Sequence, residues 1–389
     1  MYSLAHDTWD KREVNALQRV IDSGRYTMGP EVAKFETEFA KYIGSRNAVM
    51  TNSGSSANLI ALTSIVQSPD YDLNPGDEVI VPAVSWSTTF FPVNQNQLKL
   101  KFVDICKDSL NIDVDLVEQA ITEKTKAVFA VNLLGNSCEL IKLKNICNRN
   151  SIVLIEDNCE SFGAMHNKKY CATWGDAGTF SFFFSHHLQT MEGGMIVTDN
   201  DDLADYMRSL RAHGWVRDIG NDSALYTKSG DPFEDSFRFV LPGYCVRPLE
   251  MSGAVGQVQL EKADKMIFQR KQNSKVYHEL FDSIDYARTQ VPTDNSVHSY
   301  FGFSFVLENS LRDRRKEVIE LFKQNGVECR PIVAGNFMRN PVIERLDYTT
   351  FGDYYAANEI HDQGFFLGND NRNLEQALHK VKELMETLV

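Results

Sequence analysis

The feature that most constrains the fold of this 389-residue chain is a series of short apolar runs separated by helical stretches. The runs are Glu78–Pro82, Leu100–Asp104, Ala127–Leu134, Ile152–Asp157, Thr179–Phe184 and Met195–Thr198. Helical patterns, such as residues 115–121 and 139–148, follow several of them. Buried strands joined by crossover helices form a mainly parallel sheet that is covered on both faces. The sequence therefore predicts an α/β fold around such a sheet.

Helical patterns flank this region on both sides. Before it, one helix ends at Gly24 and Pro30 begins a second helix. After it come a long helix from about Leu249, strands near residues 300–306 and 328–332, and helices near residues 311–325 and 373–388. We expect a large α/β domain over residues 1–250 and a smaller C-terminal α+β domain over residues 251–389. Residues 218–236 are polar and rich in turn formers, which predicts a mobile loop or lid, or else disorder.

Composition excludes several classes of partner. The net charge of −13 argues against nucleic acid and anionic membrane surfaces. No run reaches the ~18 apolar residues of a membrane helix, and the N-terminus does not read as a signal peptide. The seven cysteines include no C-x-x-C pair, which favours a reducing cytoplasm and predicts no metal centre.

Two motifs follow predicted strands and could hold an aromatic cofactor that carries a phosphate. In TNSGSSANL (51–59), Gly54 and Ser55 stand where a helix begins, and backbone N–H groups there bind anions; a plain helix N-cap is the alternative. In PAVSWSTT (82–89), Trp86 could stack on a flat ring, or it could be a core aromatic.

Two further motifs carry acid–base groups. In LIEDNCES (154–161), Asp157 ends a strand, where a carboxylate could pair with the nitrogen of a pyridine ring or cap a helix; Glu160 could share either role. The segment GTFSFFFSHHLQTMEGGMIVTD (178–199) offers Ser181 for a phosphate. Its two histidines, His186 and His187, are candidate general bases, although a histidine in an apolar stretch is more often part of the core.

The order of these motifs resembles that in DegT-type sugar aminotransferases, which are pyridoxal phosphate (PLP) enzymes of fold type I, with an aspartate-aminotransferase-like architecture. Those enzymes show the pattern S-F-x-x-x-K-x-x-x-x-x-E-G-G, and here the lysine position is His186. No lysine lies between Tyr170 and Arg217. A histidine moves protons near neutral pH but forms no lasting covalent bond with PLP. The resemblance therefore implies removal of a hydroxyl group rather than amino transfer.

Within the family, the chain is similar to members that remove the 3-hydroxyl group of a GDP-linked 4-keto-6-deoxy sugar. The similar stretches are TWD (8–10), YTMG (26–29), SGSSANL (53–59), VPAVSWSTT (81–89), residues 154–161, SHH-x-x-TMEGG (185–194), RAHGW-x-R (211–217), FVLPGY-x-VRPLEMSGA (239–254) and ECRPIV-x-GNF (328–337). The resemblance implies PLP and pyridoxamine phosphate as cofactors and L-glutamate as amino donor. It also implies a 3,6-dideoxy-4-keto product for lipopolysaccharide or capsule. It leaves open whether the sugar is a hexose or a heptose.

The resemblance also assigns roles to single residues. Gly54, Ser55 and Ser181 would hold the cofactor phosphate, Trp86 would stack on the ring, and Asp157 would pair with its nitrogen. His186 would be the catalytic base, and a pKa near 6.5 would suit both of its proton transfers. The residues expected to line the nucleotide-sugar pocket are Gly24, Arg25, Tyr26, Thr27, His213, Arg217, Arg247 and Glu328. A homodimer with shared active sites is expected, but Cys245 stands where the family has an asparagine that reaches the partner's cofactor phosphate.

Three other functions fit the same residues. The first is a nucleotide-sugar aminotransferase that tolerates histidine in place of lysine, which would release an amino sugar. The second is a non-catalytic relative that only binds a nucleotide sugar; retention of Trp86, Asp157 and both histidines argues against it. The third is an iron–sulfur-assisted dehydratase, for which the cysteine spacing supplies no cluster ligands.

Overall fold

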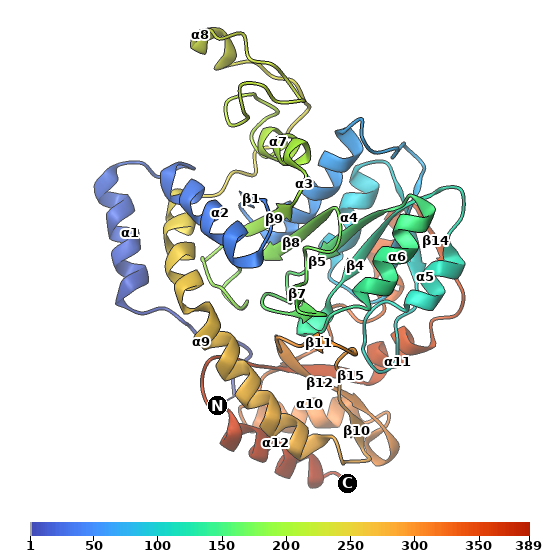
Figure 1. Cartoon of the computed structure of the whole chain (residues 1–389). Helices are drawn as coiled ribbons and strands as arrows, with labels where there is room; N and C mark the ends of the chain where they lie inside the picture. Colours follow the sequence, from blue (N-terminus) through green and yellow to red (C-terminus); the bar gives the residue numbers. More distant parts are fainter. Residues whose placement is uncertain (1) are drawn as a thin grey trace.

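A twisted eight-stranded sheet forms the centre of the computed structural model, which describes residues 2–389 (Figure 1). In spatial order its strands are β1 (Asn47–Thr51), β9 (Gly194–Thr198), β8 (Ala177–Ser181), β5 (Val153–Asp157), β4 (Thr125–Val131), β2 (Glu78–Pro82), β3 (Lys99–Val103) and β14 (Tyr348–Phe351). From β8 to β14 all neighbours run parallel, whereas β9 is antiparallel to both β1 and β8. The predicted α/β fold with a mainly parallel sheet is confirmed.

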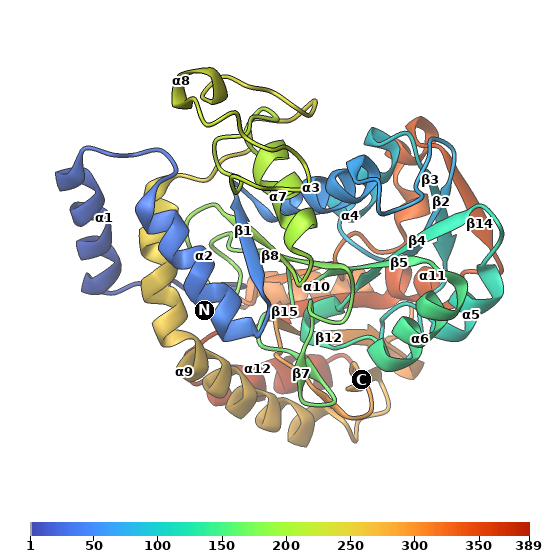
Figure 2. The same ribbon diagram turned by 45° about the horizontal axis from the view of Figure 1, so that its top comes forward.

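Helices cover both faces of this sheet, as Figures 1 and 2 show. One face packs against α3 (Gly54–Gln67), α4 (Ser87–Gln95) and α7 (Asp201–Leu210). The other face packs against α2 (Pro30–Ile43), α5 (Val114–Ala120) and α6 (Leu140–Asn150). Every residue of β2 and β5 is buried, which explains why these strands read as continuous apolar runs rather than alternating ones.

Three strands of more than two residues were not predicted from the sequence. β1 and β14 are five and four residues long and carry polar side chains, so neither stands out as an apolar run. β15 (Gly364–Gly368) is fully buried but is bounded by glycines at both ends. These strands became recognisable only through their partners, because short strands take their stability from the neighbours with which they pair.

Helix ends agree with local sequence signals. α1 (Lys11–Ser23) begins at Asp10, whose carboxylate accepts from the backbone while Glu13 bonds back to Asp10, and it ends at Gly24 with φ of 68°. α9 (Glu250–Phe281) is a single helix of 32 residues that packs on α1 and α2 at one end and on the smaller sheet and α12 (Glu375–Glu386) at the other. It corresponds to the long helix that the sequence predicts from about Leu249.

A second, four-stranded sheet forms the smaller part of the molecule. Its order is β10 (Ala287–Arg288), β12 (Gly302–Leu307), β15 and β13 (Cys329–Arg330), and it packs on α10 (Arg315–Gln324), α11 (Tyr355–Gln363) and α12. A small third sheet joins β11 (Ser296–Val297), β6 (Met165–His166) and β7 (Lys169–Tyr170). The domain boundary at residues 250 and 251 stays a prediction; β14, from the C-terminal part, lies in the large sheet.

Residues 218–236 form an arm that stands away from the body of the molecule at the top of Figure 1. The short helix α8 (Pro232–Asp235) lies at its tip, and isolated bridges join Asp222 to Thr227 and Trp215 to Phe239. The side chain of Phe233 on this helix is 83% exposed. The predicted loop is therefore a folded extension, and its mobility stays a prediction.

Candidate active site

A cavity of about 640 Å³ lies between the carboxyl ends of the parallel strands and the smaller sheet. Such strand ends are where parallel α/β sheets bind ligands. The large sheet contributes the start of α3, the loop before α4, the end of β5 and the segment after β8, while the smaller sheet contributes residues near β13 and β15. Of the predicted site residues, the cavity is lined by Gly54, Ser55, Trp86, Asp157, Glu160, Ser181, His186 and Glu328.

The start of α3 forms an anion cradle in the cavity wall. Ser53 is the N-cap and accepts a hydrogen bond of 3.1 Å from the backbone N–H of Ser56. A side chain at Gly54 would place its Cβ 2.5 Å from Cβ of Ser181 and 2.9 Å from Sγ of Cys159, so only glycine fits. The capping alternative is thus correct for Ser53, and the free N–H groups and the helix dipole at the same end still favour an anion.

Asp157 lies at the bottom of the cavity with its carboxylate fixed by three donors. One oxygen accepts from Nδ2 of Asn58 and Oγ1 of Thr89, both at 2.8 Å, and the other accepts from the backbone N–H of Cys159 at 3.0 Å. The residue is 6% exposed and begins no helix, which excludes the helix-capping alternative. A fixed, buried carboxylate at a strand end suits pairing with a protonated ring nitrogen.

Trp86 is a wall of the cavity and not part of the core. Its side chain is 58% exposed, although it stands between a fully buried strand and α4. A large aromatic side chain that is held open to a cavity has a free face on which a flat ring can stack. The core alternative is therefore wrong.

Glu160 lines the same cavity, and its Oε2 accepts from the backbone N–H of Leu134 at 3.0 Å. Burial and the nearby Asp157 raise the pKa of Glu160 to about 7. This carboxyl is thus able to exchange a proton at neutral pH, and perturbed pKa values of this kind cluster at functional sites.

His186 faces the cavity, while its neighbour faces the protein interior. The ring of His186 packs 5.2 Å from the ring of Phe301, and its backbone N–H donates to Phe183 at 2.8 Å. Burial and the positive charge of Arg270 lower the pKa of His186 to about 4. His187 is 2% exposed, and its Nε2 lies 3.2 Å from the carbonyl oxygen of Ser299.

This pKa corrects the expectation of a base that titrates near 6.5. At neutral pH the imidazole of His186 is uncharged, so it has a free ring nitrogen that can accept a proton, but its lowered pKa makes it a weaker base than an exposed histidine. The same burial destabilises the imidazolium, so His186 gives up an accepted proton readily.

Most of the predicted sugar-nucleotide residues lie outside the cavity of their own chain. Gly24, Arg25, Tyr26 and Thr27 form the connection between α1 and α2, where Tyr26 is 51% exposed and Thr27 forms a bridge with Leu249. His213, Arg217 and Arg247 instead lie around the indole of Trp215. Cζ of Arg217 is 4.1 Å and Cζ of Arg247 is 5.2 Å from a ring centre of Trp215. The ring centre of His213 is 5.3 Å from that of Trp215. Cys245 is exposed beside Arg247.

Arg330, which was not predicted from the sequence as a site residue, lines the cavity together with Glu328. The two residues are two positions apart at β13, so their side chains lie on the same side of an extended segment. The other ionised or ionisable side chains of the lining are the carboxylates Asp157, Glu160, Glu192 and Glu328, the thiol of Cys159 and the imidazole of His186. Arg330 is thus the positively charged side chain of this cavity. Its position two residues after the predicted site residue Glu328 in an extended segment could have indicated this role from the sequence.

Residues 2–389 contain no group of three His, Cys, Asp or Glu side chains that could hold a metal ion. In the same residues we find no helix with the length and apolar character needed to cross a membrane.

Comparison with known proteins identifies the family. The DegT/DnrJ/EryC1/StrS aminotransferase family matches residues 7–386. The chain belongs to this family. GDP-4-keto-6-deoxy-D-mannose 3-dehydratase of Yersinia pseudotuberculosis is 46% identical over 387 residues, which are 99% of this chain and 98% of that protein. The protein of the same name from Escherichia coli O55:H7 is 44% identical over 387 residues and 99% of each chain.

Solved structures of such relatives are similar over their whole length. The structure of the E. coli 3-dehydratase with bound hydrated PLP has a TM-score of 0.96 at 44% identity and covers 99% of both chains. A structure of GDP-4-keto-6-deoxymannose 3-dehydratase with a trapped adduct of PLP and glutamate has the same TM-score and the same sequence identity. The match covers 99% of this chain and 100% of that chain. The predicted fold type is therefore confirmed.

Proposed function

We propose that the protein is a PLP- and glutamate-dependent 3-dehydratase of a GDP-linked 4-keto-6-deoxy sugar. This proposal rests mainly on one observation: His186 faces the cavity at the position where the family has its lysine. No lysine lies between Tyr170 and Arg217 to replace it. Relatives of that name are 44% and 46% identical over nearly the whole chain. The product is a 3,6-dideoxy-4-keto sugar, whose use is the supply of lipopolysaccharide or capsule.

The residues of the cavity fit PLP and pyridoxamine phosphate. The cradle at Gly54, Ser55 and Ser181 would hold the phosphate, Trp86 would cover one face of the ring, and Asp157 would keep the ring nitrogen protonated. When bound, the cofactor supplies an amino group and an electron sink. Glu160, with a pKa of about 7, lies within the same lining and would donate a hydrogen bond to an oxygen on the ring.

His186 performs the proton transfers. As a neutral base, His186 would take up a proton from a C–H bond, and the electron pair of that bond would expel the hydroxyl group at carbon 3 of the sugar. The same imidazolium then protonates the departing oxygen, which leaves as water. Hydrolysis frees the 3-deoxy sugar and ammonia. The two electrons for this deoxygenation come from glutamate, which leaves as 2-oxoglutarate.

Arg330 would recognise glutamate. The amino donor carries two carboxylates, and the described lining of the cavity offers this one guanidinium beside several carboxylates that would repel it. Glu328, on the same side of β13, would accept hydrogen bonds from sugar hydroxyl groups. In the present chain its Oε2 accepts from the backbone N–H of Leu4 at 3.0 Å, which fixes its position.

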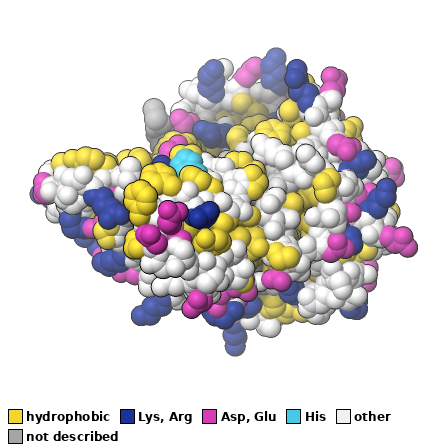
Figure 3. All heavy atoms as spheres, turned by 90° about the horizontal axis from the view of Figure 1, so that it is seen from above, with side chains coloured by type: hydrophobic (Ala, Val, Ile, Leu, Met, Phe, Trp, Pro, Cys, Tyr) yellow, Lys and Arg dark blue, Asp and Glu magenta, His cyan; other side chains and the backbone are white. Residues whose placement is uncertain are grey.

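The enzyme would act as a homodimer with shared sites. His213, Arg217 and Arg247, with residues 24–27, lie outside the cavity of their own chain, where they would serve the partner's cavity. Large apolar side chains are exposed on the surrounding surface, including Val14 at 58%, Ile21 at 47% and Leu249 at 56%. Figure 3 shows hydrophobic side chains gathered on the lobe at its left, on the side of α1. A second copy of the chain would bury this surface.

A mixing experiment tests the shared site. His186→Asn and Arg247→Ala homodimers are each expected to be nearly inactive. If the sites are shared, mixed dimers contain one site that retains both side chains, and activity returns to at most half of the wild-type value per dimer. Failure to regain activity in verified mixed dimers would show that both residues serve one chain's own site.

Product analysis tests the reaction itself. The purified protein, PLP and glutamate are incubated with a panel of 4-keto-6-deoxy nucleotide sugars, hexoses and heptoses included, and the products are identified by mass spectrometry. Loss of one oxygen from the sugar with release of ammonia is expected. A 4-amino sugar would show an aminotransferase, and unchanged sugars throughout the panel would favour a non-catalytic binding protein. All seven cysteines are free thiols, which suits the cytoplasmic location that we propose.

A further inference from the structure

The segment that carries His186 has little regular structure of its own. Between β8 and β9 its local backbone bonds include those from His186 to Phe183 and from Thr190 to Phe182, at 2.8 and 2.9 Å. With no lysine in the segment, a covalent bond to the cofactor cannot set its position. The position of the imidazole must therefore come from noncovalent contacts with other parts of the chain.

Gln189, three residues after His186, supplies those contacts. Its backbone N–H donates to Oε1 of Gln259 at 3.1 Å, and its backbone oxygen accepts from Nε1 of Trp9 at 2.9 Å. Its side-chain oxygen accepts from both the backbone N–H and the hydroxyl of Thr8 at 3.0 Å, and its Nε2 donates to the carbonyl of His6 at 2.9 Å. Every polar group of Gln189 is thus paired with residues outside the segment.

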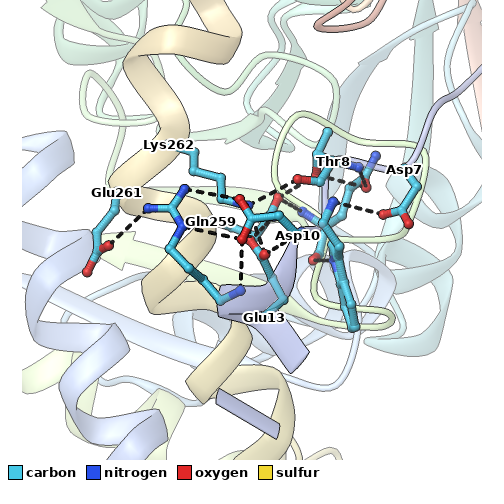
Figure 4. A network of polar contacts seen from close by, with 10 residues as sticks. Asp7, Thr8, Asp10, Glu13, Gln259, Glu261 and Lys262 are labelled. Carbon is cyan, nitrogen blue, oxygen red and sulfur yellow. Dashed lines mark hydrogen bonds and ion pairs between the residues drawn. The ribbon is translucent and has the colours of Figure 1, made fainter. Parts of the chain in front are cut away.

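Gln259 on α9 connects this anchor to a buried ion pair. It is fully buried, and its Oε1 also accepts from the hydroxyl of Thr8 at 2.8 Å. Its Nε2 donates to Oε1 of Glu13 at 2.7 Å, and Nζ of Lys262 lies 2.6 Å from the same oxygen. Figure 4 shows Thr8, Gln259, Glu13 and Lys262 meeting between α1 and α9.

Position along α9 supports a specific role for this face of the helix. Ser252 lies seven residues, or about two helical turns, before Gln259, and its hydroxyl donates to the carbonyl oxygen of Thr190 at 3.2 Å. Gln189 and Thr190 are therefore both held by side chains on one face of α9. Buried ion pairs add little net stability but cost much when one partner is removed. The carboxylate of Glu13, held by Lys262, can only accept hydrogen bonds, so Nε2 of Gln259 points to Glu13 and its Oε1 is left to accept from the backbone N–H of Gln189.

We propose that Gln259, oriented by Glu13 and Lys262, is a positioning residue that sets the location of His186 through Gln189. This inference rests on the proposed function for the part played by His186. A shift of the imidazole by about 1 Å is enough to cost on the order of 10²-fold in rate. Hydrogen bonds from this network thus fix the position of His186, which no covalent bond to the cofactor can fix.

The chain offers a matched control on the same helix. Gln257 is 4% exposed, and its Nε2 donates to the backbone oxygen and to Oε2 of Glu31, at 2.9 and 2.7 Å, on the side of α2. Gln259→Leu and Gln257→Leu each remove one buried amide from α9, yet only the first touches the His186 segment. Thr8→Val is a milder variant that removes one hydroxyl from the network and keeps the backbone bond to Gln189.

Three measurements on the holoenzyme test the proposal. Gln259→Leu is expected to lower kcat 10- to 100-fold with KM values within about threefold, and Thr8→Val to lower kcat less in the same direction, while Gln257→Leu stays within about twofold. Hydrogen–deuterium exchange of the peptide over residues 183–192 should accelerate in Gln259→Leu and not in Gln257→Leu. In a His186→Asn background, Gln259→Leu should cause no further loss of kcat, because it acts through the missing imidazole.

Equal losses in Gln259→Leu and Gln257→Leu, unchanged exchange of the 183–192 peptide, or additive losses with His186→Asn would each overturn the proposal. If Gln259→Leu does not fold, Thr8→Val takes its place in all three measurements. The exchange experiment needs no turnover, so it separates this proposal from the identity of the substrate. A wild-type protein that made no 3-deoxy sugar would overturn the proposed function instead.

Discussion

Replacement of Glu160 by glutamine is expected to make the protein more stable at alkaline pH and to leave it nearly unchanged in acid. Glu160 lines the cavity, and burial together with Asp157 raises its pKa from 4.5 to about 7. Glutamine has nearly the same shape, and its amide oxygen can accept the 3.0 Å hydrogen bond from the backbone N–H of Leu134. The substitution therefore removes the titration and keeps the contact.

The sign follows from where the proton is held. In the folded protein the carboxyl keeps its proton up to about pH 7, and in the unfolded chain only up to about pH 4.5. The stability that this group contributes is full below pH 4.5 and is lost as the pH rises through 7. The pKa difference corresponds to roughly 3 kcal/mol in free energy of unfolding. Water in the cavity screens the charge and reduces this free-energy difference. We therefore expect the free energy of unfolding of Glu160→Gln, relative to wild type, to rise by about 1–2 kcal/mol between pH 5 and pH 8.

Urea unfolding of the apoprotein at pH 5, 6, 7 and 8, followed by circular dichroism, measures this difference. Wild type and variant are compared at one protein concentration, because the stability of the proposed dimer would depend on concentration. Glu192→Gln is the control for the removal of another carboxylate from the same cavity. A difference between Glu160→Gln and wild type that is constant over this pH range, or that shrinks as the pH rises, would refute the assignment of a raised pKa to Glu160.

Three further outcomes are expected for the holoenzyme. His186→Asn should lower kcat ~10²–10⁴-fold in steady-state kinetics, and His187→Asn much less because its ring faces Ser299; the reverse ranking would identify the other histidine as the base. Arg330→Met should raise the KM for glutamate at least tenfold and the KM for the nucleotide sugar much less, and equal effects on both would contradict a role in donor recognition. Borohydride treatment followed by peptide mapping should find no pyridoxyl group on any lysine, and a single modified lysine would disprove noncovalent binding of the cofactor.

The central strands of the fold and the residues at the bottom of the cavity could be predicted from the sequence, because both follow from local patterns. β2 and β5 are recognisable as buried runs, and the places of Gly54 and Asp157 follow from the strand ends that precede them. The short strand β14 escaped prediction because its pairing with β3 joins residues almost 250 positions apart.

Other properties of the site depend on surroundings that no local pattern contains. The pKa of His186 is lowered by burial and by Arg270, which comes from the distant helix α9, so an ordinary value was expected from the sequence. Gln259 and Gln257 look alike in the sequence, and only the structure separates the one that faces the His186 segment from the one that faces α2. Arg217 and Arg247 lie outside the cavity because one chain does not contain the whole site that we propose.

The long helix α9 has a mechanical consequence for how substrates enter. At roughly 1.5 Å per residue it is a rod of about 48 Å, and it has no proline along its 32 residues. A side chain at Gly253 would place its Cβ 2.7 Å from the backbone of Val32, so the rod lies directly against α2 near its start. Its far end, with Tyr277 and Phe281, is embedded in the core of the smaller sheet. Because a continuous helix connects the two parts of the molecule, we expect substrates to enter the cavity through movement of surface loops and not through opening of one part from the other.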